Sequence, residues 1–476
     1  SRRPVTLSVM PYRSPAFLRR VFHRFVKHRA QVLQIQTLLT TKGLLQYGLS
    51  ASFFSKKEST ILFNVLLESH LGSKQAFQRS VYLFTLMLAT QIQPDRYTFP
   101  PLFKAAKLSF SCTGISFHCQ SLRRGVLSDP FVQTSLLSFY SHGYELVNAR
   151  KVFDEILTPS TVECNAMLDA FARNGDMKSS VWLFSRMIDR DVVSWTTLIN
   201  GFALIGFHQE AIEVFREMIR RESSIAPSEA TMVCVLSSCS KLEGGKGFSP
   251  GKQIHCHLIK WDTHTVFLGT SLIDFYGKMG SSDYADKIFR NMKKKEACTW
   301  NAMINSLANN GHEKQALETF SMMKQRGIIP NSVTFVSLLS ACARTKHARL
   351  GFDLFRFMLV EFNLFPVTEH YGCLVDLLGQ VGLVSEACEI VKSMPFEPDV
   401  SVLNGLLNAC KVNGEMICGG EVGERISRLQ PQSCGKYVAL ATISCELERW
   451  DFAAEIRRSM VVAGIQKVPA CSWIDL

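Results

Sequence analysis

The chain lacks the sequence patterns that mark several classes of protein. It has fifteen cysteines in 476 residues but no Cys-x-x-Cys, so it encodes neither that redox motif nor a paired-cysteine metal site. Its apolar runs are far shorter than the roughly 18 residues of a membrane-spanning helix, and we expect no membrane partner. The odd number of scattered cysteines favours free thiols in a reducing compartment. Five of them fall on the apolar face of predicted helices and should pack as small core residues: Cys164, Cys234, Cys298, Cys373 and Cys410.

Acidic residues are absent from the first 57 positions. Eleven Lys or Arg precede Glu58, the first acid, so the net charge of +12 leaves only +1 for residues 58–476. An acid-free, Arg-rich start predicts an organelle transit segment over residues 1–35, with the mitochondrion favoured and the chloroplast as alternative. A basic arm that binds nucleic acid or lipid is the other interpretation. Residues 36–59 are interpreted as a degenerate repeat or linker, because QIQTLLTTKGL echoes QIHCHLIKWD at 253–262.

Complete catalytic signatures are also missing. His208-Gln209-Glu210 matches half of a zinc deaminase motif, but no Cys-x-x-Cys supplies the remaining ligands. GFSPGK at 247–252 resembles a phosphate loop, yet Lys246 and Gln253 replace two residues that such a loop needs, so we interpret it as an insertion before a repeat helix. His255, Cys256 and His257 are helix neighbours and point apart. We therefore expect no enzyme activity, no metal and no cofactor.

What the chain does have is one motif that returns along its length. A small residue, a Phe four positions later and a Met or Ile three positions after that share one face of an α-helix. The Phe positions are Phe153, Phe184, Phe215, Phe289, Phe320 and Phe355, with steps of 31, 31, 74, 31 and 35 residues. A return of this kind is the signature of a repeat array, in which each unit buries its apolar face against its neighbours.

One unit, residues 297–331, serves as the template. Helical spacing of apolar residues predicts a first helix to about Asn309, a turn at Gly311, and a second helix from Glu313 to about Gln325. Gly143, Gly175, Gly206, Gly280 and Gly382 take the place of Gly311 in other units. By this register the array covers residues 60–399, with units at 60–95, 96–129, 130–160, 161–191, 192–228, 229–265, 266–296, 297–331, 332–367 and 368–399.

Units such as VVSWTTLINGF…AIEVFREM and ACTWNAMINSL…ALETFSMM resemble the pentatricopeptide repeat (PPR) family. Long units reading TFVSLLSAC or GKQIHCHLIK resemble the PLS class of land-plant organelles, and residues 400–476 resemble its E-type C-terminal extension. The resemblance implies an all-α, right-handed superhelical solenoid of stacked helix-turn-helix repeats. It also implies binding of single-stranded organellar RNA, selection of a C-to-U editing site, and recruitment in trans of a deaminase-type editing protein with accessory editing factors.

In the family, the fifth and last residues of a unit read one base and the second residue clamps it, which suits single-strand recognition. Carried onto this chain, the reading pairs are Asn64 with Asp95, Thr134 with Ser160, Asn165 with Asp191, Thr196 with Ser228, Thr270 with Glu296, and Asn301 with Asn331. The clamps are Ile61, Phe131, Val162, Val193, Phe267 and Cys298. The long units carry Pro100, Val233 and Val336 at the fifth place, where we expect little or no readout. The alternative for any single Asn or Thr is a helix N-cap.

The C-terminal extension has helical apolar patterns but no series of reading residues. Tyr437, Trp450 and Trp473 are candidates for a partner-binding surface, and capping of the array is the alternative role. Two rival functions stay open at this point. One is an organellar factor for RNA splicing, stability or translation. The other is a peptide-binding tetratricopeptide scaffold, against which the 31-residue units count, because that repeat has 34 residues.

Overall fold

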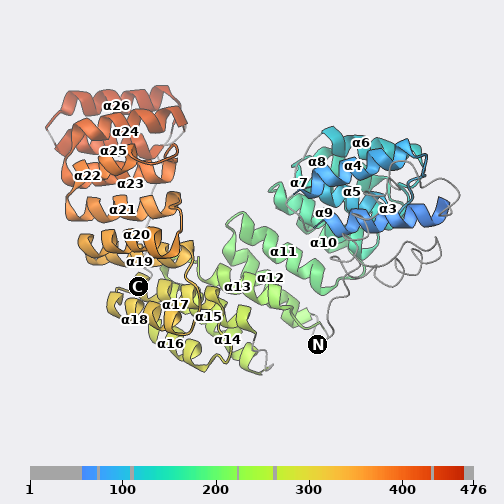
Figure 1. The fold of residues 1–476 in the computed structure, drawn as a ribbon, viewed down its shortest axis with the longest axis horizontal. Coiled ribbons are helices and arrows are strands. Elements are labelled where there is room, and N and C mark those ends of the chain that lie inside the picture. Colours follow the sequence, from blue (N-terminus) through green and yellow to red (C-terminus); the bar gives the residue numbers. More distant parts are fainter. Residues whose placement is uncertain are drawn as a thin grey trace, which may run out of the picture. The chain divides into compact units, whose positions relative to one another are not determined.

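The computed structural model describes residues 56–71, 75–107, 112–221, 225–260, 265–429, 434–446 and 448–465, and there every regular element is a helix (Figure 1). The predicted transit segment 1–35 and most of the linker 36–59 lie outside these residues. The all-α prediction is confirmed. None of the described helices is long and apolar enough to cross a membrane.

The chain divides into two compact units, up to Thr231 and from Met232 onward. Helices of the first unit come in pairs: α3 (Lys56–His70) and α4 (Ala76–Ala89), α5 (Phe99–Ala106) and α6 (Cys112–Arg123), α7 (Pro130–His142) and α8 (Leu146–Asp154), α9 (Thr161–Arg173) and α10 (Met177–Arg186), α11 (Val192–Leu204) and α12 (His208–Arg221). The first helices α5, α7, α9 and α11 each pack on the next one in this series. A solenoid of stacked helix pairs results.

The second unit continues the same pairing, after α13 (Glu229–Cys239), which crosses the boundary. Its other helices are η2 (Glu243–Gly245), α14 (Phe248–Lys260), α15 (Val266–Lys278), α16 (Ser282–Asn291), α17 (Ala297–Asn309), α18 (Glu313–Gln325), α19 (Ser332–Thr345), α20 (Ala348–Phe362), α21 (Thr368–Val381), α22 (Val384–Lys392), α23 (Val400–Asn413), α24 (Met416–Leu429), α25 (Cys434–Glu446) and α26 (Trp450–Val462). From α15 to α23 the first helices again pack in sequence, and α19–α26 lie in successive layers (Figure 1).

Where the whole turn inside a helix pair lies among the described residues, it contains at least one left-handed residue. Gly311 has φ +78°, a conformation that glycine adopts without steric cost, and it joins α17 to α18 where the sequence predicts the turn. The expectation for Gly143 is wrong. Its φ is −79°, and Tyr144 takes the left-handed conformation instead, with φ +58°. Tyr144 is the fifteenth residue of unit 130–160, as Gly311 is of unit 297–331, so the chain reverses at the same position in both units and Gly143 lies one residue before it.

The repeated Phe motif forms the contacts within and between pairs. The small residue of each motif is fully buried, as at Ala211 and Ala316. Phe184 is buried as well, in common with Phe215, Phe289 and Phe320. Phe153 and Phe355 are only half-buried.

The first part of the C-terminal extension packs directly on the last repeat. Val375 and Leu378 of α21 share one hydrophobic core with Leu403 of α23 and Ile426 of α24. Cys388 and Cys418 are joined in a disulfide, which corrects the expectation that all thiols stay free. Cys298 is exposed rather than part of the core. The extension therefore continues the stack of helix pairs instead of forming a separate fold.

Candidate nucleic-acid interface

A series of apolar side chains lies uncovered at the start of the first helices. The predicted clamps are all exposed: Ile61 (38%), Phe131 (71%), Val162 (58%), Val193 (55%), Phe267 (63%) and Cys298. From Phe131 onward each is the second residue of its helix. Exposed apolar groups in a regular series are typical of a binding surface, since a core would otherwise have buried them.

The three predicted Asn pairs are brought together by direct hydrogen bonds. Nδ2 of Asn64 donates to Oδ1 of Asp95 (2.9 Å), Nδ2 of Asn165 to Oδ1 of Asp191 (3.0 Å), and Nδ2 of Asn301 to Oδ1 of Asn331 (3.0 Å). Each bond joins the first helix of one unit to the loop that leads into the next unit. Asn165 and Asn301 are buried, with 8% and 6% of their surface exposed. These two side chains are therefore largely covered and do not project into solvent.

In two of these pairs the last residue is also the N-cap of the following helix, and in the first pair Asp95 accepts from the backbone N–H of Thr98, the N-cap of α5 (3.1 Å). The backbone N–H of Ser194 donates to Asp191 Oδ1 (2.8 Å), and that of Thr334 donates to Asn331 Oδ1 (3.2 Å). The capping role considered for these residues is thus present for the last residue of the pair. It does not exclude ligand binding, because all these bonds use a single atom, Oδ1.

The second terminal atom of each capping side chain stays available. Oδ2 of Asp95 and Nδ2 of Asn331 make no hydrogen bond to any group in the described part of the chain, and the bonds to Asp191 from the Asn165 amide and from the Ser194 backbone and hydroxyl all end on Oδ1. The assignment of Asn331 follows from its bond to Thr334, since a backbone N–H can only donate and therefore faces the amide oxygen. Two pairs offer a carboxylate acceptor, and the third offers an amide donor.

Ionisation of the reading carboxylate is favoured at neutral pH. Partial burial raises the pKa of Asp191, but hydrogen bonds from Ser194, Asn165 and Val193 together outweigh it, and the pKa lies below its usual value. Asp191 therefore presents a negatively charged acceptor.

The Thr pairs are joined less directly. Thr196 reaches Ser228 through the hydroxyl of Thr231, with Oγ1–Oγ1 and Oγ–Oγ1 distances of 2.7 and 2.9 Å. Thr270 contacts the hydroxyl of Thr299 (2.9 Å), while Glu296 caps α17 and forms an ion pair with Lys294 (3.1 Å).

Thr134 and Ser160 form no such link within the described residues. Thr134 donates to its own helix, at the Pro130 carbonyl (2.8 Å). The position of the bridging hydroxyl is occupied by Glu163, whose Oε2 accepts from the backbone N–H of Ser160 (2.6 Å). This pair is therefore not assembled like the others.

Sequence reasoning missed the residue that completes most of these networks. It is the third residue of the following unit, a hydroxyl in five cases: Thr98, Ser194, Thr231, Thr299 and Thr334. A signal was present, because DRYT, DVVS and NSVT place it three residues after the capping residue, as in a capping box.

A pocket of about 640 Å³ lies where the first reading pair meets its clamp. Ile61, Asn64 and Asp95 line it, together with two exposed aromatic rings, Tyr97 (56%) and Phe131. Tyr97 is the second residue of unit 96–129 and was not predicted as a clamp. Flat apolar walls beside a polar pair suit a planar heterocycle with hydrogen-bonding edges.

The long units differ at the corresponding place. Pro100, Val233 and Val336 are half-buried and have no side-chain polar atom to offer. The prediction that they read no base stays open.

Comparison with known proteins places this architecture in one family. A sequence model described as "PPR repeat" matches residues 164–192, 193–223, 270–296, 333–361 and 369–397, and one described as "PPR repeat family" matches 295–344. A pentatricopeptide repeat-containing protein of Arabidopsis thaliana is 45% identical over 455 residues, which cover 95% of this chain and 96% of the relative. The chain belongs to the pentatricopeptide repeat family.

Two further PPR proteins complete the comparison. A pentatricopeptide repeat-containing protein of Arabidopsis thaliana, named as mitochondrial, is 32% identical over 403 residues, which cover 84% of this chain and 57% of the relative. The crystal structure of the maize PPR protein PPR10 in complex with an 18-nt psaJ RNA element covers 97% of this chain and 77% of its own, with 16% identity and a TM-score of 0.44.

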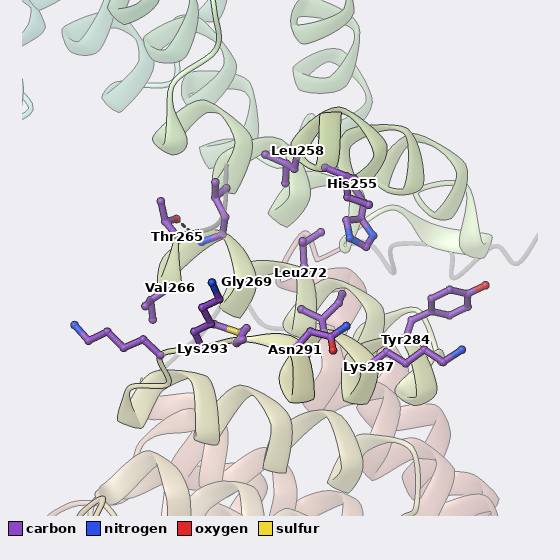
Figure 2. A pocket seen from close by; sticks show the side chains of 15 residues that line it. His255, Leu258, Thr265, Val266, Gly269, Leu272, Tyr284, Lys287, Asn291 and Lys293 are labelled. Atoms are coloured by element: carbon purple, nitrogen blue, oxygen red, sulfur yellow. Dashed lines mark hydrogen bonds between the residues drawn. The ribbon is translucent and has the colours of Figure 1, made fainter. Parts of the chain in front are cut away.

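A second pocket in the PPR array, of about 800 Å³, lies among α14, α15 and α16 (Figure 2). Its lining residues include Lys287, Lys293 and Lys294 and no Asp or Glu. Figure 2 shows Tyr284, Lys287 and Asn291 of α16 on one side and His255 of α14 above them. This pocket contains none of the predicted reading or clamping residues.

The residues of the incomplete catalytic motifs lie in or next to ordinary helices of the PPR array. His208 begins α12, and His255 contacts the Tyr276 hydroxyl (2.9 Å). GFSPGK is not an insertion before a helix, because α14 already begins at Phe248. No group of three or more His, Cys, Asp and Glu suited to a metal occurs in the described residues.

The proposed partner surface of the extension is described in part. Trp450 is the first residue of α26 and is 64% exposed. Tyr437 in α25 is half-buried, and Trp473 lies outside the described residues. Of the three candidates, Trp450 is the one whose ring is shown to be accessible.

Proposed function

We propose that this PPR protein binds one stretch of single-stranded organellar RNA and specifies a cytidine for C-to-U editing. One observation carries the proposal. In each Asn pair, Oδ1 of the last residue accepts the hydrogen bonds that hold the network together, which leaves its other terminal atom for a ligand, and the predicted clamp of the same unit is exposed. A base can therefore be held between clamps while its Watson–Crick edge meets one free acceptor or donor.

The free atoms favour particular bases. Uridine presents N3–H as a donor and O4 as an acceptor, which complement the free carboxylate oxygen of Asp95 or Asp191 and the remaining N–H of Asn64 or Asn165. Asn331 offers an amide donor instead, which suits acceptors on the edge of either pyrimidine. The Thr pairs are assigned to purines by the family resemblance, and Ser160, Ser228 and Glu296 leave the choice between G and A open.

The same resemblance supplies the register. The array would run parallel to the RNA, with the final repeat 368–399 over the fourth nucleotide upstream of the edited cytidine. Counted back one base per unit, the pair Asn301 and Asn331 falls at −6, Asn165 and Asp191 at −10, and Asn64 and Asp95 at −13. Purines are expected at −7, −9 and −11. Positions −5, −8 and −12 lie under the long units and should be permissive.

Editing itself requires a deaminase, which we propose is recruited in trans through residues 400–476. The continuous core between α21 and α24 supports this role, because it fixes the extension to the last repeat and hence near the 3′ end of the bound RNA. Relatives named as mitochondrial and as chloroplastic support organellar targeting, and we favour the mitochondrion.

The proposal is tested on organellar transcripts from a loss-of-function line. Editing is supported if one cytidine stays unedited and editing returns with the wild-type protein. Altered splicing, abundance or translation with complete editing would instead support the rival RNA function. A purified array that retains no single-stranded RNA would favour the scaffold interpretation. A triple Ala variant at Asn64, Asn165 and Asn301 is the matched control for RNA retention through the reading pairs.

A further inference from the structure

Two units carry the same Asn and Asp reading pair but differ in the residue that completes it. In unit 60–95 the hydroxyl of Thr98 donates to Asn64 Oδ1 (2.7 Å), as Thr334 does to Asn301 Oδ1 (2.7 Å). In unit 161–191 the equivalent residue is Ser194, whose hydroxyl donates to Asp191 Oδ1 (2.9 Å) instead. Asn165 Oδ1 is buried and has no hydrogen-bond partner in the described part of the chain.

This difference changes how firmly the amide is held. Asn64 is fixed at both ends, by Asp95 at Nδ2 and by Thr98 at Oδ1, so only its remaining N–H can face a ligand. Asn165 is fixed at Nδ2 alone. Its carbonyl oxygen is a buried acceptor without a donor, which is an unfavourable state that any new donor would relieve.

The side chain at the third position explains the choice of partner. A β-branched threonine has few χ1 rotamers, which restricts where its hydroxyl can point. Thr98 holds its hydroxyl near both oxygens, 2.7 Å from Asn64 Oδ1 and 3.1 Å from Asp95 Oδ1, and accepts from the Asp95 N–H (3.0 Å). Serine is freer to rotate, and the hydroxyl of Ser194 bonds to Asp191 Oδ1 without reaching Asn165 Oδ1, while it accepts from the backbone N–H of Asp191 (3.2 Å).

We propose that this third-position hydroxyl sets how sharply an Asn/Asp pair discriminates uridine from cytidine, and that unit 161–191 is the permissive one. The inference rests on the proposed RNA-binding function. Cytidine presents an N4 amino donor where uridine presents the O4 acceptor. Asn64 meets that donor with its own N–H, which is repulsive, and can turn only by breaking two hydrogen bonds. Asn165 can turn by breaking only one hydrogen bond, and its oxygen, which has no partner, can then accept from the cytidine amino group.

The test is selection from a random 20-nucleotide single-stranded RNA pool on the immobilised full-length protein. Uridine-to-cytidine enrichment is compared at two positions three nucleotides apart, which the register assigns to units 60–95 and 161–191. We expect the ratio to be higher by on the order of tenfold under unit 60–95. Ser194→Thr should raise the ratio under unit 161–191 and leave the other unchanged, and Thr98→Ser should lower the ratio under unit 60–95 alone.

The outcomes separate this inference from the proposed function. Retention of no RNA overturns the proposed function and the inference with it. Clear enrichment with equal ratios at both positions overturns the inference alone. A change in melting temperature for Ser194→Thr or Thr98→Ser without a change in ratio also overturns it, because the hydroxyl would then be only part of a helix cap.

Discussion

The ring of Phe184 meets the indole of Trp195 edge to face, with centroids 4.7 Å apart and planes at 73°. The same contact recurs between Phe289 and Trp300, at 4.9 Å and 82°. In both cases the second helix of one unit meets the first helix of the next. The repeated Phe therefore joins consecutive units, and its loss should weaken the stack rather than the RNA-binding surface.

Phe184→Ala should lower the free energy of unfolding by about 3–5 kcal/mol, because a buried aromatic ring leaves a cavity. Phe131→Ala is the matched control, since that ring is 71% exposed. It should change stability by less than about 0.5 kcal/mol and weaken RNA binding by about 1–3 kcal/mol. Urea denaturation and RNA titration of both variants measure this. An equal loss of stability in the two would show that the two faces are wrongly assigned.

Asn301→Ala should cost more stability than Asn165→Ala. Removal of Asn301 breaks two hydrogen bonds, to Asn331 and from the Thr334 hydroxyl, and leaves that hydroxyl only its longer contact with Asn331 Oδ1 (3.2 Å). Removal of Asn165 breaks one and also removes an unpaired buried oxygen. Asn165→Ala should still weaken RNA binding by about 1–3 kcal/mol, through loss of a base contact. Melting curves and RNA titrations of both variants give the comparison. The reverse order of stability would contradict the networks described.

His370 should make stability fall in mild acid. The ring is fully buried, Nδ1 accepts from the Val367 N–H (3.1 Å), and Nε2–H donates to the Ser332 carbonyl (3.0 Å), so the fold holds the neutral form. Burial lowers its pKa from 6.5. The unfolded chain then binds a proton at this histidine more readily than the folded chain does. The contribution of neutral His370 to the free energy of unfolding is therefore complete above pH 6.5 and is lost as the pH falls below that value.

Urea denaturation at pH 7.5 and 5.5 measures the effect of His370. A His370→Gln variant should be less stable at pH 7.5 but should lose less stability between the two pH values. The half-buried His118 and His142, whose pKa values burial also lowers, account for part of the loss of stability that remains in the variant. If the variant lost as much stability as the wild type between pH 7.5 and 5.5, His370 would not be the group that titrates.

Trp450→Ala should abolish editing while RNA affinity and melting temperature stay unchanged, because the ring is exposed and lies outside the reading pairs. Val462→Ala, at an 89% exposed residue of the same helix, is the control and should support normal editing.

Deletion of residues 434–476 should also abolish editing with RNA affinity nearly intact. Loss of RNA affinity or stability on deletion would support a capping role instead.

The register predicts a difference between two RNA positions. Replacing the uridine at −10 by adenosine should cost about 1–3 kcal/mol, since adenine N1 is an acceptor and would face the carboxylate of Asp191, which is also an acceptor. A change at −8, under unit 229–265 with Val233, should cost little. Binding assays on RNAs altered at one position each decide this. If the change at −8 weakens binding and the change at −10 does not, the register or the code is wrong.

Much of the repeat architecture could be predicted because its cause is local. Helix periodicity and the return of the Phe motif require paired helices that bury one face on a neighbour, and α17 and α18 begin and end where the template places them. The exposed clamps follow from the same register. The preference of glycine for a left-handed turn predicts the turn of unit 130–160 at Gly143, whereas the position in the unit that is equivalent to Gly311 belongs to Tyr144.

The sequence by itself determined the repeat and the all-α class, and its register predicted the three Asn pairs that hydrogen bonds join. Only the tertiary structure decided which atoms of those pairs are already used. The bonds that decide this join residues 26 to 34 positions apart, from Asn165 with Asp191 to Thr98 with Asn64. They depend on how closely successive units pack. A difference of one methyl group between Thr98 and Ser194 then changes the hydrogen bonding of an otherwise identical pair.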